Sequence, residues 1–220
     1  MQRAALALAV IAALSGGAAA RAQLPGMPVW NTPRGGSRFF FAADAGYPDV
    51  SSVVSGDVYA ARAAAGFQAF TVSATVGVRS QASTVQGSNT EYGGAAAYRI
   101  IGGSLIPVAI NVQGGAAFWS ESGASNQRYT GAVGISVDVP IPYVTMEPWI
   151  APGIRVTRLG TNSASPFQST EFGWAAGLTF GFGMFGVHLA YDSEKQPSPA
   201  PTTGTFGIGV HIDIRPPLGL

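Results

Sequence analysis

The chain has 220 residues, with 12 Lys+Arg against 11 Asp+Glu and a formal net charge of +1 at pH 7. Charged residues make up only 10% of it, whereas an average soluble domain carries about 25%. Without a cluster of positive charge, we expect no nucleic-acid partner. The sequence contains no cysteine, which excludes disulfides, thiol catalysis and Cys-ligated metal.

Residues 1–22 have the pattern of a secretory signal peptide. A basic residue precedes the apolar stretch 4–14, and small residues lead to Ala20-Arg21-Ala22, an A-x-A cleavage pattern. We expect cleavage before Gln23. The segment 23–36 is rich in proline and has no periodicity, so it predicts a flexible N-terminal lead-in. Past residue 22 no apolar run approaches the roughly 20 residues of a spanning helix.

From Ser37 onward the dominant pattern has a period of two. Between Phe206 and Ile214 every even position is large and apolar, and the odd positions are glycine, histidine or aspartate. This alternation is typical of strands with two unlike faces. Ten such segments span 37–46, 57–67, 70–79, 90–101, 107–119, 127–139, 144–158, 169–182, 186–194 and 203–215. Their lengths suit tilted membrane strands of about 9–11 residues better than soluble strands of about 5–6.

The connections alternate between short and long. The short ones are 68–69, 102–106, 140–143 and 183–185, and the long, polar ones are 47–56, 80–89, 120–126, 159–168 and 195–202. Short periplasmic turns alternating with longer extracellular loops are typical of outer-membrane barrels. An open sheet cannot cross lipid because its edges are unpaired. We therefore predict an all-β fold, a closed up-and-down antiparallel transmembrane barrel of ten strands, or of eight if two segments are miscounted. Pro148 and Pro152 each remove a ladder donor, which predicts a bulge or a local edge there.

The aromatic residues test the membrane interpretation. Aromatic residues that occupy the apolar, outward-facing positions near the strand ends should form girdles at the two membrane interfaces. These are Tyr59, Tyr92, Phe118, Tyr129, Phe172, Trp174, Tyr191 and Phe206 near the loop ends, and Phe67, Phe70, Tyr98, Phe180 and Phe182 near the turn ends.

The alternate positions that face inward place charged residues of both signs in the lumen. They are Arg38, Asp44, Arg62, Arg79, Glu91, Arg99, Arg128, Asp138, Glu147, Arg155, Glu171, Asp192, Asp213 and Arg215. A selectivity filter needs a ring of one charge, so mixed signs favour a salt-bridged network. His188 and His211 should face each other near the periplasmic mouth. We expect them to form a polar cluster, with metal binding as the alternative that the two imidazoles leave open.

The chain resembles the small outer-membrane β-barrel proteins of Gram-negative bacteria. The resemblance covers the signal peptide and residues 37–215, and Thr205 to Ile212 is similar to the C-terminal assembly signal of that family. It implies an outer-membrane location after signal-peptide cleavage. The implied partners are outer-membrane lipid and the barrel-assembly machinery; the extracellular loop partner is left open.

The sequence favours a non-enzymatic protein with no cofactor and no metal. Gly181 to Gly186 matches G-x-G-x-x-G, but a strand pattern follows it where a nucleotide site needs a helix. Outer-membrane proteases carry a catalytic histidine at the extracellular rim, whereas both histidines here lie near the turn ends. We predict a porin-like narrow pore or conduit for small or hydrophobic solutes. The alternatives are a structural or surface-interaction barrel with a salt-bridged closed lumen, and a soluble periplasmic lipid-binding barrel.

Overall fold

A computed structural model describes residues 23–49, 56–80, 89–103, 106–121, 123–196 and 200–214. The expected signal peptide and Arg215 lie outside these ranges. Within them, the chain forms one sheet of eleven strands. The strands are β1 (Arg38–Pro48), β2 (Val58–Phe67), β3 (Phe70–Arg79), β4 (Asn89–Gly103), β5 (Ile106–Glu121), β6 (Ala124–Val137), β7 (Val139–Ile141), β8 (Val144–Leu159), β9 (Phe167–Phe182), β10 (Phe185–Glu194) and β11 (Thr203–Ile214).

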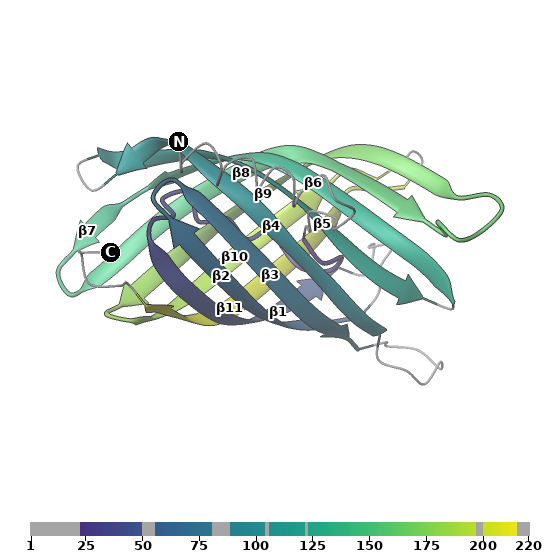
Figure 1. The fold of residues 1–220 in the computed structure, drawn as a ribbon, viewed down its shortest axis with the longest axis horizontal. Coiled ribbons are helices and arrows are strands. Elements are labelled where there is room, and N and C mark those ends of the chain that lie inside the picture. The colour runs from purple at the N-terminus through teal and green to yellow at the C-terminus, as the bar shows by residue number, and fades with distance from the viewer. Residues whose placement is uncertain are drawn as a thin grey trace, which may run out of the picture.

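The sheet is closed into a barrel with antiparallel neighbours throughout. The spatial order runs β6-β5-β4-β3-β2-β1-β11-β10-β9-β8-β7, and β6 also pairs with β8, which completes the ring. The first and last strands join from Phe39 opposite Ile214 to Pro48 opposite Thr205. Figure 1 shows the tilted strands wrapping around one long axis. The predicted closed antiparallel ten-stranded barrel is confirmed, because β7 continues β6 along the same partner.

The two prolines of β8 interrupt its ladder with β6 and β7. The pairs run to Ala132–Gly153 and resume at Ile135–Ile150, so the gap falls opposite Pro152. After Ser136–Trp149 they resume at Val139–Met146, opposite Pro148. Each proline removes the backbone donor that this ladder needs. The register is the same on both sides of each gap, so of the two predicted forms there is no bulge, and the strand has a local edge where the ladder is interrupted. The prolines pair with β9 without interruption.

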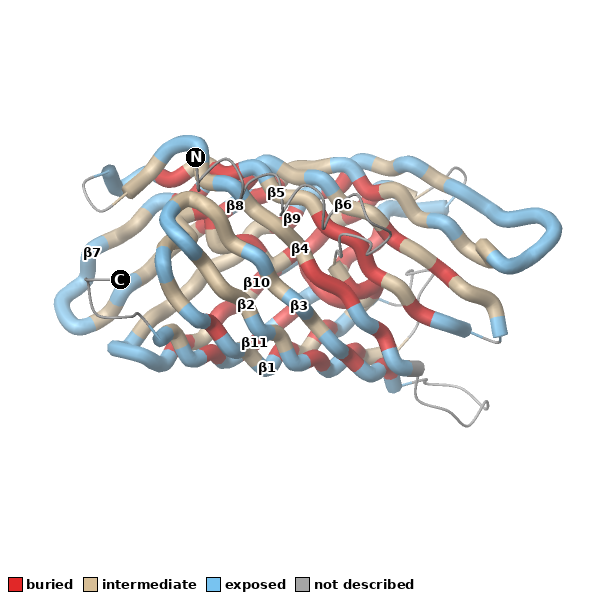
Figure 2. The backbone as a smooth tube through the Cα atoms, viewed as in Figure 1, coloured by how far each residue is buried: buried red, intermediate tan, exposed pale blue. Residues whose placement is uncertain are grey.

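The two faces of the barrel differ as the alternation predicts. On β3, Val72, Val76 and Val78 are exposed, whereas Gly77 and Arg79 between and beyond them are buried. The same alternation runs along β11, from exposed Phe206 to buried His211. Figure 2 shows short buried stretches alternating with exposed and intermediate ones along the strands. The outer surface thus carries large apolar residues, and the lumen is lined by small and polar residues.

Residues 23–36 lie inside this lumen. Leu24 and Met27 are 1% and 2% exposed, and Pro25, Pro28 and Pro33 are among the most buried side chains. In Figure 1 the purple N-terminal segment lies within the ring of strands. The segment has neither helix nor strand, as its prolines dictate, but it differs from the predicted flexible lead-in because its apolar side chains find buried contacts. We call residues 23–36 the plug.

Glycines on the inner wall make room for the plug. A Cβ added to Gly77 would lie 2.6 Å from Leu24 Cδ1, and one on Gly207 would lie 2.5 Å from Pro28 Cγ. A Cβ on Gly46 would collide with the backbone of Gly26 and Met27. At these three positions a side chain on the wall would collide with the plug.

The Gly46→Ala substitution tests this packing. The new methyl group meets backbone atoms that cannot rotate away, and we expect a loss of about 1–3 kcal/mol of unfolding free energy, as in other overpacked interiors. Hydrogen exchange of the plug amides should accelerate. Gly131→Ala is the matched control, because a Cβ there meets nothing within 4 Å. Equal plug protection in the two variants would show that the wall does not hold the plug.

Candidate functional site

The plug runs along the lumen from the loop end of the barrel to the turn end. At its start, the Gln23 side chain donates to Asp192 Oδ2 at 3.4 Å, close to the end of β10, and the Val29 amide donates to the same oxygen at 3.2 Å. Near its finish, Arg34 donates to the Gly103 and Pro107 carbonyls at 3.0 and 2.6 Å, and its guanidinium lies 3.7 Å from Asp138. Both openings of the barrel are thus tied to one continuous segment.

In the middle of the lumen, two side-chain groups hold the plug. Asn31 and Asn111 exchange amide hydrogen bonds of 2.9 and 3.3 Å, and both are 2% exposed. Trp30 meets the His188 ring edge-on, with 4.5 Å between ring centroids. The Arg62 guanidinium lies 5.5 Å from the Trp30 ring centroid, within the range of a cation–π contact. The plug is therefore fixed by specific polar contacts as well as by apolar packing.

The inward charges form ion pairs of opposite sign. Arg155 donates to both oxygens of Asp192 through its two terminal nitrogens, Nη1 and Nη2, at 2.6 and 2.7 Å, and Arg128 pairs with Glu194. This fork geometry suits arginine in places where water is excluded. The other pairs are Arg79–Glu91, Arg38–Asp213 at 3.0 Å and Arg62–Asp44 at 2.9 Å. The paired signs give the described lumen no ring of one charge.

The remaining predicted lumen charges lie in different surroundings. Arg99 donates to the carbonyls of Arg34 and Gln68 and so supports the turn end of the plug. Glu147 accepts a hydrogen bond from Ser136 at 2.5 Å. Glu171 is half-buried and lies opposite Arg155 across the β8–β9 ladder.

The two histidines meet inside the lumen. His188 pairs with Gly209 in the ladder and His211 with Gly186, a shift of two residues from the predicted facing pair, and their Nδ1 atoms lie 2.9 Å apart. His188 Nε2 lies 2.6 Å from Asp44 Oδ1. If His188 donates to Asp44 through Nε2, the neutral His211 must donate its Nδ1 proton to His188.

This cluster has the properties of a structural polar network. The glycines opposite the two histidines leave space for both rings, since a Cβ at Gly186 would collide with His211 and one at Gly209 with His188. Arg62 adds a positive charge 3.3 Å from His188 Nε2, which opposes a bound cation. Among the described residues, no group of three or more His, Asp or Glu side chains is arranged to hold a metal ion.

The plug divides the free space of the lumen unequally. The larger cavity, of about 280 Å³, lies on the loop side and is lined by Gln23, Trp119, Arg128, Phe167 and Glu194 among others. We call it the outer vestibule. Two cavities beside the plug measure only about 40 and 50 Å³. Of these three cavities, the vestibule therefore has the most room for a solute.

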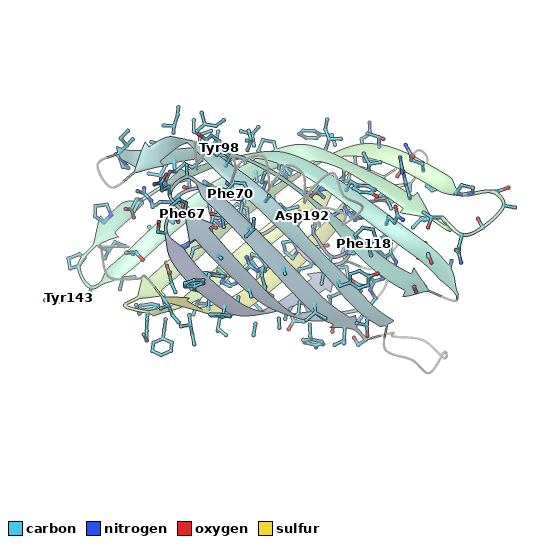
Figure 3. All side chains as sticks on the ribbon, in the orientation of Figure 1. Phe67, Phe70, Tyr98, Phe118, Tyr143 and Asp192 are labelled. Atoms are coloured by element: carbon cyan, nitrogen blue, oxygen red, sulfur yellow. The ribbon has the colours of Figure 1, made fainter. Side chains whose placement is uncertain are left out.

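The predicted aromatic residues all lie at outward positions. Figure 3 shows Phe67, Phe70 and Tyr98 toward the end that carries Tyr143, and Phe118 toward the other end. The exposed ones are Tyr59, Phe67, Tyr92, Tyr98, Phe172, Trp174, Phe182, Tyr191 and Phe206. The half-buried ones are Phe70, Phe118, Tyr129 and Phe180. Tyr92 stacks on Phe118 with 5.6 Å between ring centroids.

Sequence reasoning missed the plug residues and the vestibule. Trp30, Asn31 and Arg34 stand in a segment without periodicity, so nothing in the pattern shows that they face a lumen. One signal was present: large apolar residues alternate with the prolines from Leu24 to Trp30, which is unusual for a solvated linker. The run of glycine and alanine at inward positions was the complementary signal.

Comparisons with known proteins give only distant likenesses. No family model matches the chain, and no curated protein matches it. Among solved structures, it is similar to the N-terminal β-barrel domain of Pseudomonas aeruginosa OprF, with 11% identity, 82% of this chain and 99% of that chain covered, and a TM-score of 0.40. Neisserial surface protein A shares 13% identity, with 79% and 96% covered and a TM-score of 0.41. The Yersinia pestis attachment invasion locus protein Ail, in complex with the heparin analogue sucrose octasulfate, shares 12%, with 80% and 95% covered and a TM-score of 0.34. These values carry no inference about function.

No helix in the described part of the chain is long and apolar enough to cross a membrane.

Removing the Asp192 charge should destabilise both the barrel and the plug. Asp192→Asn leaves Arg155 with only Glu194, 3.4 Å away, and weakens the acceptor for the Val29 amide. Breaking a buried ion pair from one side costs about 3–5 kcal/mol, and we expect about 3 kcal/mol because Glu194 remains. Urea titration of the folded protein in lipid vesicles measures the loss.

Glu171→Gln is the control for this substitution. Glu171 lies opposite Arg155 in the ladder but is only half-buried, so its loss should cost less than about 1 kcal/mol. Equal losses in the two variants would contradict the central place of the Arg155–Asp192 pair.

Proposed function

We propose that the protein is an integral outer-membrane barrel whose lumen is closed by its own N-terminal segment, and that it acts at the cell surface as a structural or interaction barrel. The observation that carries the proposal is the plug: residues 23–36 occupy the lumen of a barrel with an apolar exterior. A narrow open pore, the function favoured by the sequence alone, requires a clear path where this segment lies.

The apolar exterior supports the location in a membrane. Val76 and Val210 are 51% and 56% exposed on the outer face, together with nine of the predicted aromatic residues. Burying this surface in lipid removes the cost of exposing it to water. A soluble periplasmic barrel would turn its large apolar residues inward, whereas here the inside is filled by charged pairs and a proline-rich segment.

The plug also supports a second candidate function, a gated conduit. The strands around the plug are joined by backbone ladders, but the plug itself is held by contacts with side chains, such as Asn31–Asn111 and Val29–Asp192. It can therefore leave the lumen without breaking any barrel ladder. In this scheme the closed form is the resting state of a conduit for small solutes.

A charge on the outer face tests the membrane location. Val210→Arg places arginine on the outer face in the middle part of β11, and we expect a loss of about 2–4 kcal/mol of folding free energy in lipid vesicles. The wild-type protein should fractionate with the outer membrane and migrate more slowly in gels after boiling.

Tyr143→Arg serves as the control, because Tyr143 is 99% exposed in a turn outside the strands. Its cost should be about 0–1 kcal/mol, the value near an interface. Recovery of the protein in the soluble periplasmic fraction, or equal tolerance of both arginines, would refute the membrane location.

Conductance in planar bilayers tests closure. Protein purified from outer membranes should give no steady single-channel steps, whereas deletion of residues 23–33 should produce them because the plug is gone and Arg34 remains at the turn end. Heat-modifiable migration verifies that the deletion variant is folded. If it is not, Gly46→Ala offers a milder displacement of the plug.

Two results distinguish the functions. Steady wild-type steps of the same size as those of the deletion variant would show an open pore and overturn the proposal. Rare wild-type steps that reach the size seen in the deletion variant would select the gated conduit over the permanently closed barrel.

A further inference from the structure

The N-terminal end of the plug lies at the loop end of the barrel. The Gln23 side chain donates to Asp192 Oδ2 at 3.4 Å. In the ladders Asp192 lies opposite Thr205, and Thr205 lies opposite Pro48, the last residue of β1 before the long connection to β2. Gln23 also lines the outer vestibule. The residue before which we expect signal-peptide cleavage therefore lies at the last rung of the ladder on the loop side.

A tight turn over residues 24–27 holds this end of the plug in place. The turn is closed by a backbone hydrogen bond of 3.1 Å, and Gly26 has a φ of 77°, as expected for glycine after proline in a type II turn. Arg79, the last residue of β3, donates to the Pro25 carbonyl at 3.1 Å. A Cβ on Gly26 would lie 3.0 Å from Val58 Cγ2, at the start of β2. Both strands contact the turn at their loop ends.

The other end of the plug continues into β1 at the turn end of the barrel. Gln68, in the short connection between β2 and β3, donates its backbone amide to Ser37 Oγ at 3.0 Å. Arg99 donates to the Arg34 carbonyl. From there β1 runs to its last rung at the loop end. The plug and β1 therefore cross the barrel in opposite directions, and the chain enters and leaves this pair of segments on the loop side.

This path conflicts with a signal peptide that is still attached on the opposite side of the membrane. An exported precursor reaches the outer membrane from the periplasm, which is the side of the short turns in the proposed orientation. The strand ladder is closed, so only the lumen connects Gln23 to that side. The plug already occupies the lumen, and the two cavities beside it measure about 40 and 50 Å³, too little for a second segment of chain.

We propose that the plug closes the lumen only with a free N-terminus, so that removal of the signal peptide is the step that permits closure and leaves Gln23 at the cell-surface mouth. The proposal rests on the outer-membrane location and the closed lumen proposed above. It adds an order of events: cleavage comes first, and the plug takes its place afterwards. It also adds a topology, in which the mature chain begins on the outside and its next segment leads back toward the periplasm.

Cysteine labelling on intact cells tests where the N-terminus lies, because the chain has no cysteine of its own. The reporter variant carries the insertion Ala-Cys-Gly between Ala22 and Gln23, and mass spectrometry verifies that its mature chain begins with the insertion. A membrane-impermeant maleimide should label it on intact cells as fully as it labels Ser165→Cys, at an exposed position between β8 and β9. Tyr143→Cys, in the exposed turn at the opposite end, should be labelled only after the outer membrane is permeabilised.

The loop and turn variants show which part of the scheme fails. Heat-modifiable migration verifies that each variant is folded. If Ser165→Cys is labelled on intact cells and the reporter is not, the N-terminus does not reach the cell surface, and the proposal is overturned while the membrane location stands. If Ser165→Cys itself requires permeabilisation, the proposed location or orientation of the barrel is wrong, and the proposal falls with it.

A fusion protein tests whether closure needs a free end. A folded domain placed between the signal peptide and Gln23 is too large to enter the lumen, so it should keep the plug out. Hydrogen exchange of the plug amides should then be faster than in wild-type protein purified from outer membranes. The Ala-Cys-Gly insertion is the matched control, because it lengthens the N-terminus without a folded domain and should keep wild-type protection. Wild-type protection in the folded fusion protein would overturn the proposal, and if the fusion does not assemble, the labelling result decides.

Discussion

Closure of the strand ladder is the constraint on which the rest of this structure depends. Once β1 pairs with β11 and β6 with β8, every second side chain must enter one narrow lumen. Because these side chains displace most of the water from the lumen, the folding free energy depends both on how well they fill its volume and on whether their charges are paired. Glycine and alanine keep the inner wall from overfilling the lumen. Ion pairs such as Arg155–Asp192 and Arg62–Asp44 neutralise the charges that enter it. The plug fills what remains.

The sequence predicts what alternation controls and fails where alternation stops. The barrel, its ten strands and the facing of Val76 or Asp192 follow from a period of two, since one step of register moves a side chain to the other face. The histidine pair was predicted from the loop midpoint, and the actual register differs by two residues, because the position of the fold within a loop of polar residues is not encoded in parity. A shift of two preserves the face, so His188 and His211 still meet. The plug has no period, so alternation cannot place it in the lumen, and the large apolar residues between its prolines are the one signal that the sequence offers.

Strand β8 keeps its register in the closed barrel although two of its residues are prolines. Pro148 and Pro152 remove ladder donors on the β6 side, and a bulge would have been the usual way to absorb the loss. A bulge would also shift every later residue of β8 to the opposite face, including the buried Arg155. The structure keeps the register and loses hydrogen bonds locally, which indicates that the placement of the lumen ion pairs outweighs a few ladder contacts.

The plug and the barrel wall are held by the same carboxylate. Asp192 accepts hydrogen bonds from both arms of Arg155, from the Val29 amide at 3.2 Å and from the Gln23 side chain at 3.4 Å. The plug therefore supplies two of the donors that satisfy this buried group. Displacement of the plug would remove both donors and leave Asp192 with Arg155 alone, so the stability of the ion pair and the position of the plug are linked.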